Sequence, residues 1–170
     1  MITVSIEPAN VEALKALAYV PGAIRKVTTR AIKKSITAGK REAKSGAKRR
    51  YTLPSGIVGR AMTSSAGGLR GQIRVVGSRN KISQGKVKET AHGVYALIVR
   101  GQGGVINKAF KKKYQGGWWQ RLGKPRFPIR ELKTVSAPGM VSHPTVSTPT
   151  VNKMGEILNR EILNGIAAVI

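Results

Sequence analysis

Two different apolar patterns follow one another along the first fifty residues of the chain. Apolar and polar residues alternate from Ile2 to Ile6, which predicts a strand with one buried face. After Pro8 the apolar spacing becomes helical and predicts a short amphipathic helix that Asn10 caps and that ends near Tyr19. Pro21 and Gly22 then break this helix.

A single long helix is predicted from Ala23 to about Arg50. Toward the C-terminal end its apolar residues are only alanines. This end is therefore expected either to pack closely on a neighbour or to project away from the core. Gly39 and Gly46 each cost roughly 1 kcal/mol relative to alanine in a helix interior, which predicts that the last turns fray or bend. The two apolar stripes of the helix are Ile24, Val27, Ala31, Ser35 and Ala38, and Ile32, Ile36, Ala43 and Ala47.

The middle of the chain is rich in short apolar runs and in Gly and Ser. Pro54 suits the first position of a short helix. In chain order, the patterns predict this helix at 55–62, a Ser/Gly turn region at 63–71, a strand at 72–76, a polar basic loop at 77–89, a buried strand at 94–99 and a glycine turn at 101–104 before Val105 and Ile106.

The stretch from Ala109 to Leu132 contains both tryptophans, both phenylalanines and many basic residues. Gly116-Gly117 and the segment 122–125 interrupt its aromatic runs, which is typical of extended segments joined by turns. A basic aromatic hairpin of this kind suits contact with nucleic acid, contact with another subunit, or a small sheet with cationic edges.

The last part of the chain predicts a connector and a final helix. Residues 136–150 contain three prolines with many Ser and Thr and predict an extended connector; residues 151–168 predict a helix. The fold class is therefore α+β: a long basic N-terminal helix and a C-terminal helix packed on a small, mainly antiparallel sheet, with extended loops or arms. One domain is expected, with parts at 1–62, 63–135, 136–150 and 151–170.

The charge of the chain is far from balanced. Its 170 residues include 31 Lys and Arg against 7 acids, all Glu, for a net charge of +24. Self-repulsion opposes such an excess, so a nucleic acid, an anionic membrane or an acidic protein is expected nearby. No apolar run is long enough to span a membrane, and no signal-peptide pattern opens the chain, which predicts a cytoplasmic protein that does not use a membrane.

Catalytic chemistry is not indicated. The chain has no Asp and no Cys, and its two imidazoles, His92 and His143, lie in a glycine-bounded loop and in the Pro-rich segment. Neither a carboxylate pair nor a metal-ligand spacing nor a triad is present. We therefore expect no enzyme activity, no cofactor and no metal.

Two groups of side chains are the candidates for binding. Basic residues neutralise phosphates without reading sequence, and aromatic residues stack on bases or pack against subunits. The candidates for contact with DNA or with an acidic neighbour are Arg30, Lys33, Lys34, Lys40, Arg41, Lys44, Lys48, Arg49, Arg50, Lys111, Lys112 and Lys113. The candidates for packing or subunit contact are Phe110, Tyr114, Trp118, Trp119, Phe127 and Ile129.

Over most of the span from Ile24 to Ile166, the chain resembles the prophage minor tail protein Z family of long-tailed phages. Three parts carry the resemblance: the basic helix that leads into Tyr51-Thr52-Leu53-Pro54, the stretch 109–132, and, loosely, residues 136–141. The second is the most specific, with an Ala-Phe, a glycine turn and a basic aromatic strand before Pro128-Ile129-Arg130-Glu131-Leu132. Phe127 stands where the family usually has Leu.

The resemblance implies a structural virion protein that completes the tail and joins it to the head. It implies a ring, commonly of six copies, that meets tail-terminator, tail-tube and head-connector proteins around the channel for genomic DNA. Location in the virion, and in the host cytoplasm during assembly, would follow. The composition alone leaves a second class open, a non-specific DNA- or RNA-binding protein similar in composition to ribosomal proteins.

Overall fold

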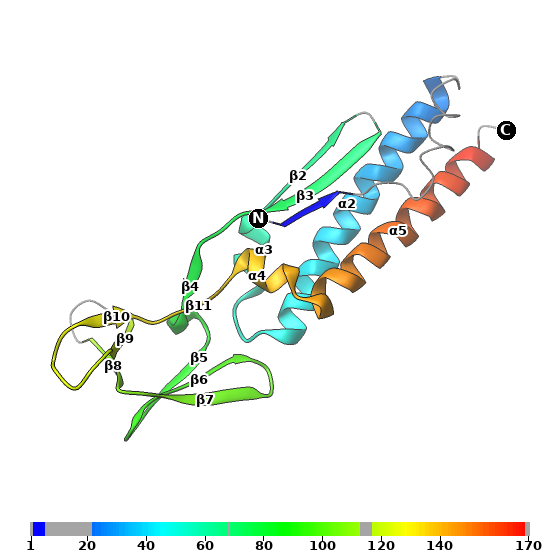
Figure 1. Cartoon of the computed structure of the whole chain (residues 1–170). Helices are drawn as coiled ribbons and strands as arrows, with labels where there is room; N and C mark the ends of the chain where they lie inside the picture. The colour runs from blue at the N-terminus through cyan, green and yellow to red at the C-terminus, as the bar shows by residue number, and fades with distance from the viewer. Residues whose placement is uncertain (1, 6–21, 68, 113–116, 169–170) are drawn as a thin grey trace.

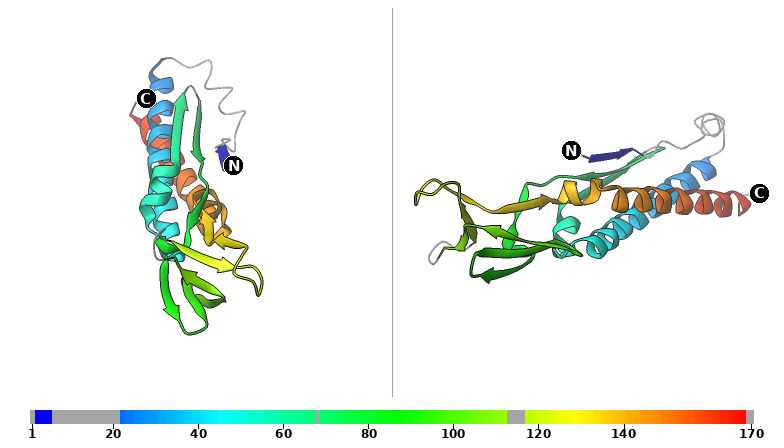
Figure 2. Two further views of the ribbon diagram at one scale, coloured as in Figure 1. Left: turned by 90° about the vertical axis from the view of Figure 1, so that its left-hand side faces the viewer. Right: turned by 60° about the horizontal axis from the view of Figure 1, so that its bottom comes forward.

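The computed structural model describes residues 2–5, 22–67, 69–112 and 117–168. Two long helices lie side by side at one end of an elongated molecule, and small antiparallel sheets extend from the other end (Figure 1). Figure 2 shows the same extended outline from two further directions. The combination confirms the predicted α+β class. We call the part from Arg79 to Ser136 the β arm. The helix predicted to end near Tyr19 lies outside the described residues.

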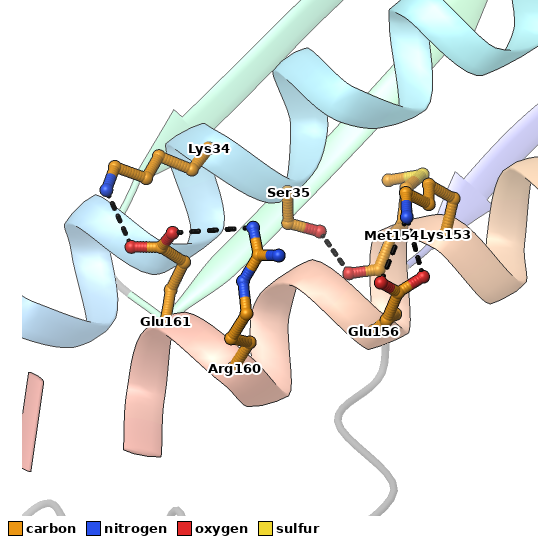
Figure 3. Close-up of polar contacts among 7 residues, drawn as sticks. All are labelled: Lys34, Ser35, Lys153, Met154, Glu156, Arg160 and Glu161. Carbon is orange, nitrogen blue, oxygen red and sulfur yellow. Dashed lines mark hydrogen bonds and ion pairs between the residues drawn. The ribbon is translucent and has the colours of Figure 1, made fainter. Parts of the chain in front are cut away.

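Helices α2 (Gly22–Arg50) and α5 (Pro144–Ala167) run antiparallel and in close contact. The position of α2 agrees with the predicted long helix. A Cβ atom on Gly39 would lie 2.5 Å from Cγ of Met154, so only glycine allows this approach without a shift. Beside it, the buried Ser35 hydroxyl donates a hydrogen bond of 2.7 Å to the carbonyl of Met154 (Figure 3).

The C-terminal end of α2 lies against the start of α5. Gly46 is buried there, and a Cβ atom on it would lie 3.1 Å from Cγ1 of Val146. Ala43 and Ala47 are buried as well. The predicted fraying of the last turns is therefore wrong, because the missing side chains make room for the neighbouring helix rather than leaving the backbone in water.

A three-stranded antiparallel sheet of order β1-β3-β2 packs on α2, with the central strand β3 (Arg70–Val75) between β1 (Ile2–Ser5) and β2 (Met62–Gly67). Ile73 and Val75 of β3 are buried in the main core. The predicted turn region at 63–71 is wrong, since β2 occupies most of it. The exposed Ser and Thr of β2 carry no apolar alternation, and the strand is instead held by pairing with β3 along its whole length.

Two short helices complete the main core. Helix α3 (Ser55–Ala61) agrees with the predicted helix after Pro54, and α4 (Ala137–Ser142) packs beside it. The largest fully buried side chains of this core include Val58, Met140 and Met154. The main core thus joins α2, α3, β3, α4 and α5.

The Pro-rich segment 136–150 is helical, so the predicted connector is wrong. Ser136 caps α4 by accepting a hydrogen bond of 3.2 Å from the Gly139 amide, and Nδ1 of His143 caps α5 by accepting one of 3.3 Å from the Thr145 amide. Prolines are tolerated in the first helical turn because their amide would have no partner there. Pro144 has this place in α5, so the final helix starts before the predicted Val151.

Three further small sheets form the β arm. The described residues therefore form four small sheets, where the sequence predicted one. The polar loop predicted at 77–89 contains two strands and a 3-10 turn at Ile82–Gln84. In the predicted glycine turn, Gly101 turns at φ 78°, and the next strand starts at once. The strands are β4 (Arg79–Lys81), β5 (Lys86–Thr90), β6 (Gly93–Val99), β7 (Gln102–Asn107), β8 (Ala109–Lys111), β9 (Trp118–Arg121), β10 (Ile129–Glu131) and β11 (Lys133–Ser136).

The β arm has a small core of its own and is fastened to the end of α2. Its buried residues are Ile82, Val94, Ala96, Ala109 and Leu132. Ile98 packs against this core and the main core.

Arg100 is one of the residues that connect the two parts. Its amide donates to the carbonyl of Arg50 at 2.8 Å, and its Nε donates to the carbonyl of Lys48 at 3.1 Å. These carbonyls belong to the last turn of α2 and have no partner within the helix.

Candidate nucleic-acid interface

The solvent-facing side of α2 carries a line of cations, which we call the basic ridge: Lys26, Arg30, Lys33, Lys40, Lys44 and Lys48. Successive members are separated by three, four or seven residues, a spacing that keeps them on one side of a helix. At 1.5 Å per residue, the ridge is about 33 Å long. The buried residues of α2, among them Ala31, Ser35 and Ile36, face the other way, toward α5 and the sheet.

Beside the ridge, a groove opens between α2, α3 and β2. We call it the basic groove. It has a volume of about 510 Å³ and contains four cationic side chains and no acidic one. Its lining residues are Thr37, Lys40, Arg41, Lys44, Gly56, Gly59, Arg60, Met62 and Ser64.

Two glycines of α3 make the groove hollow. Ile57 and Val58 are buried in the main core, so Gly56, Gly59 and Arg60 take the side of α3 that faces the groove. The side chain of Lys44 crosses from α2 and passes 3.4 Å from the position that a Cβ atom on Gly59 would take.

The opposite wall of the groove is tied together by a polar contact. Nζ of Lys40 donates to the hydroxyl of Ser64 on β2 at 3.4 Å. Lys40 is half-buried and lines the groove. A hydroxyl and an ammonium group held in this way can both donate hydrogen bonds to an anion.

Ion pairs distinguish the predicted basic residues from one another. Nζ of Lys34 lies 2.6 Å from a carboxylate oxygen of Glu161 on α5 (Figure 3), and Arg49 pairs with Glu42 on its own helix. Within the described ranges, none of the ion pairs involves Lys33, Arg41 or Lys44. The same holds for Arg30, Lys40, Lys48 and Arg60. The surface between α2 and α3 therefore keeps its positive charge.

Arg50, also a predicted contact residue, is half-buried at the end of α2. Its guanidinium lies 5.7 Å from the centroid of the Tyr51 ring, and its Nε is buried without a hydrogen-bond partner. It is therefore set back from the ridge. Arg60 and Lys26 were not among the predicted contacts. The sequence pattern of α3 does not show that Arg60 faces α2, because that depends on how the two helices pack.

Strand β8, which carries the predicted Lys111, lies in the outer part of the β arm, away from α2 (Figure 1). Lys111 is exposed on β8, and Nζ of Lys112 lies 5.1 Å from the centroid of a Trp119 ring. Lys113 and Tyr114 lie outside the described residues. The structure thus brings the predicted cations together in two separate places rather than one.

The predicted aromatic residues of the arm divide in the same way. Trp118 packs against the core of the arm, and Phe110 and Ile129 are half-buried. Phe127, in contrast, is 64% exposed, and the nearby Leu122 is 55% exposed. Packing within the chain is therefore wrong for Phe127, and the alternative of contact with another subunit stays a prediction.

Other kinds of site find little support in the described part of the chain. His92 is exposed, and His143 caps α5. Among the described residues, no three His, Cys, Asp or Glu side chains form a group that could hold a metal ion, and no helix is long and apolar enough to cross a membrane. Comparison of the chain with protein-family models, with curated proteins and with solved structures finds no match.

Proposed function

We propose that this chain is a structural protein of a tailed-phage virion that completes the tail and joins it to the head connector. In this role it forms a ring with copies of itself, six in the expected case, around the channel for genomic DNA. Its other partners are the tail-terminator, tail-tube and head-connector proteins. It works by binding and assembly and catalyses no reaction.

One observation carries the proposal. The stretch that most resembles the minor tail protein Z family forms the far end of the β arm, where Leu122 and Phe127 are exposed. Apolar side chains exposed together on a projecting segment are a feature of protein–protein contact sites. A protein that joins two assemblies needs such a contact away from its own core.

The charge supports the same proposal. Copies of a chain with a net charge of +24 repel one another when they stand side by side, unless an anionic partner lies between them. DNA in the channel supplies such a partner. The basic ridge of α2 offers a line of six cations for this contact.

The test substitutes the exposed apolar residues of the arm tip. We expect Leu122→Ser with Phe127→Ser to lower the fraction of joined head–tail particles at least tenfold in a phage that carries the variant. Val151→Ser with Leu163→Ser removes exposed apolar residues of α5 and serves as the matched control. If the arm variant joins heads and tails as well as the control does, the proposed role of the arm is wrong.

A further inference from the structure

We propose that the basic groove between α2, α3 and β2 binds the sugar-phosphate backbone of duplex DNA. Lys40, Arg41, Lys44 and Arg60 would neutralise its phosphates, and the hydroxyls of Thr37 and Ser64 line the same hollow. This inference rests on the proposed function for the identity of the DNA, which is the genome in the channel. It goes further in assigning the contact to one place on the molecule.

Convergence of charge from two elements is the first argument. Lys40, Arg41 and Lys44 come from α2, and Arg60 comes from α3, yet all four line one hollow. Within the described ranges they take part in no ion pair, whereas Lys34 and Arg49 on the same helix do. Unpaired cations held near one another repel, and an anion between them removes that repulsion.

The shape of the groove is the second argument. Gly56 and Gly59 remove the side chains that would otherwise fill the space beside α3. A Cβ atom built on Gly56 meets nothing within 4 Å. Glycine at such a place lets the backbone of a ligand come close to the backbone of the protein.

The chemistry of the lining favours a phosphodiester over an acidic peptide. The hot spots of protein–protein interfaces are enriched in Trp, Tyr and Arg that fill well-packed pockets. The lining of the groove includes Arg but no aromatic residue. The one large apolar side chain in the lining, Met62, is buried. Point charges and hydroxyl donors are instead the groups that proteins direct to DNA phosphates.

Continuity with the basic ridge is the third argument. Lys40 and Lys44 belong to both features, so the groove opens onto a line of cations about 33 Å long. Duplex DNA carries about one negative charge per 1.7 Å of its axis, so its charge continues along the whole ridge. A short acidic peptide segment would cover only part of this line of cations. The groove would hold one strand while the ridge follows the backbone beside it.

The test places a carboxylate in the groove. Gly56→Glu adds the charge where a side chain has open space, and Gly56→Gln adds a side chain of the same shape without the charge. Gly155→Glu, at an equally open position on α5, makes the same change in net charge elsewhere. Arg60→Gln removes one cation of the groove without adding bulk.

The measurement is the affinity of the purified full chain for a fluorescein-labelled DNA duplex over a series of salt concentrations. We expect Gly56→Glu to weaken binding about tenfold and to lower the slope of log K against log salt by about 1, the effect of losing about one phosphate contact. Arg60→Gln should lower the slope similarly. Gly56→Gln should weaken binding less than Gly56→Glu, and Gly155→Glu should change it less than twofold. Equal binding by the Gly56→Glu and Gly155→Glu variants would overturn the assignment.

A polyglutamate of matched charge, used as a competitor, tests the acidic-protein alternative. We expect it to displace the duplex only at a concentration at least tenfold higher than unlabelled DNA requires. The proposal is wrong, and the groove is a protein site, if polyglutamate competes as well as DNA does and if the Gly56→Glu variant weakens the binding of polyglutamate as much as that of DNA.

The two proposals fail separately. Binding of DNA is measured on the isolated chain and does not depend on whether the chain belongs to a virion. Joining of heads and tails is measured on particles and is expected to follow the tip residues Leu122 and Phe127. A groove variant with normal DNA affinity would refute the groove alone, and normal joining by the arm variant would refute the joining role alone.

Discussion

Gly39 gives the sharpest test of how α2 and α5 pack. Alanine is favoured over glycine in a helix interior by about 1 kcal/mol, so Gly39→Ala would stabilise an isolated helix. In the folded chain, however, the new Cβ atom would lie 2.5 Å from Cγ of Met154 and 3.1 Å from Cδ1 of Ile73. Both residues are buried, so Met154 has little space into which it can move.

Overpacking of this kind costs about 1–3 kcal/mol. Set against the gain in helix propensity, it predicts that Gly39→Ala lowers the free energy of unfolding by about 0–2 kcal/mol. Gly155→Ala is the matched control, because its Cβ atom has open space on α5; it should raise the free energy of unfolding by up to about 1 kcal/mol. Urea unfolding followed by far-UV circular dichroism measures both.

A double-mutant cycle then tests the contact itself. Met154→Ala alone should cost about 2–5 kcal/mol because it empties a fully buried site. Combined with Gly39→Ala it should cost less than the sum of the two, by about 0.5–3 kcal/mol, since the new methyl group enters the emptied space. Strict additivity, or equal stabilisation by Gly39→Ala and Gly155→Ala, would refute the packing described.

Three smaller predictions follow from polar contacts. Arg100→Ala should lower the free energy of unfolding by about 1 kcal/mol, because the carbonyl of Lys48 loses a donor. It should also speed exchange of the Thr52 amide, which donates to the carbonyl of Ile98 at the same junction, whereas Arg79→Ala on β4 should do neither. Lys34→Ala should change stability by less than about 1 kcal/mol, and less still at high salt, because the Lys34 side of its ion pair with Glu161 is exposed. The hydrogen bond from Lys153 lowers the pKa of Glu156, so its stabilising effect is present above the carboxyl pKa of the unfolded chain and is lost as pH falls through the folded pKa. An NMR titration should show the midpoint of Glu156 rising in Lys153→Met, and an unchanged midpoint would contradict the contact.

The helices were predictable because their patterns are long and local. The run of basic and apolar residues from Ala23 to Arg50 repeats over many turns, and Pro54 marks the start of α3 by its fixed backbone. The start of α5 was missed because prolines were taken to exclude a helix. Pro144 lies in the first turn of α5, where proline is tolerated and where the His143 side chain also supplies a cap. Pro149 lies inside α5, so the helix forms there despite the general cost of an interior proline.

The short strands were less predictable, because some are polar and others pair with a strand distant in the sequence. Strand β2 is polar and is held by pairing with β3, and β4 pairs with β11 across more than fifty residues of chain. A polar strand lacks the alternation of apolar and polar residues by which a strand is predicted from sequence. The hairpin stretch 109–132 was recognised because its aromatic residues and glycines alternate within one short segment.

The candidate site also has one part that was predictable from the sequence and one part that was not. The ridge follows from the helical period and was predicted nearly whole. The groove was not, because it needs the distance between α2 and α3, which no local pattern supplies. Arg60 therefore joined the site only once the fold placed Gly56 and Gly59 opposite Lys40 and Lys44.

The most direct test of the central claim is the position of this chain in an image of the intact phage particle. We expect copies of the chain to be arranged as a ring at the head–tail junction. In that ring, the arm tips at Leu122 and Phe127 contact a neighbouring protein, and the basic ridges face the DNA. A chain absent from the particle, and found instead on nucleic acid in the host cell, would contradict it.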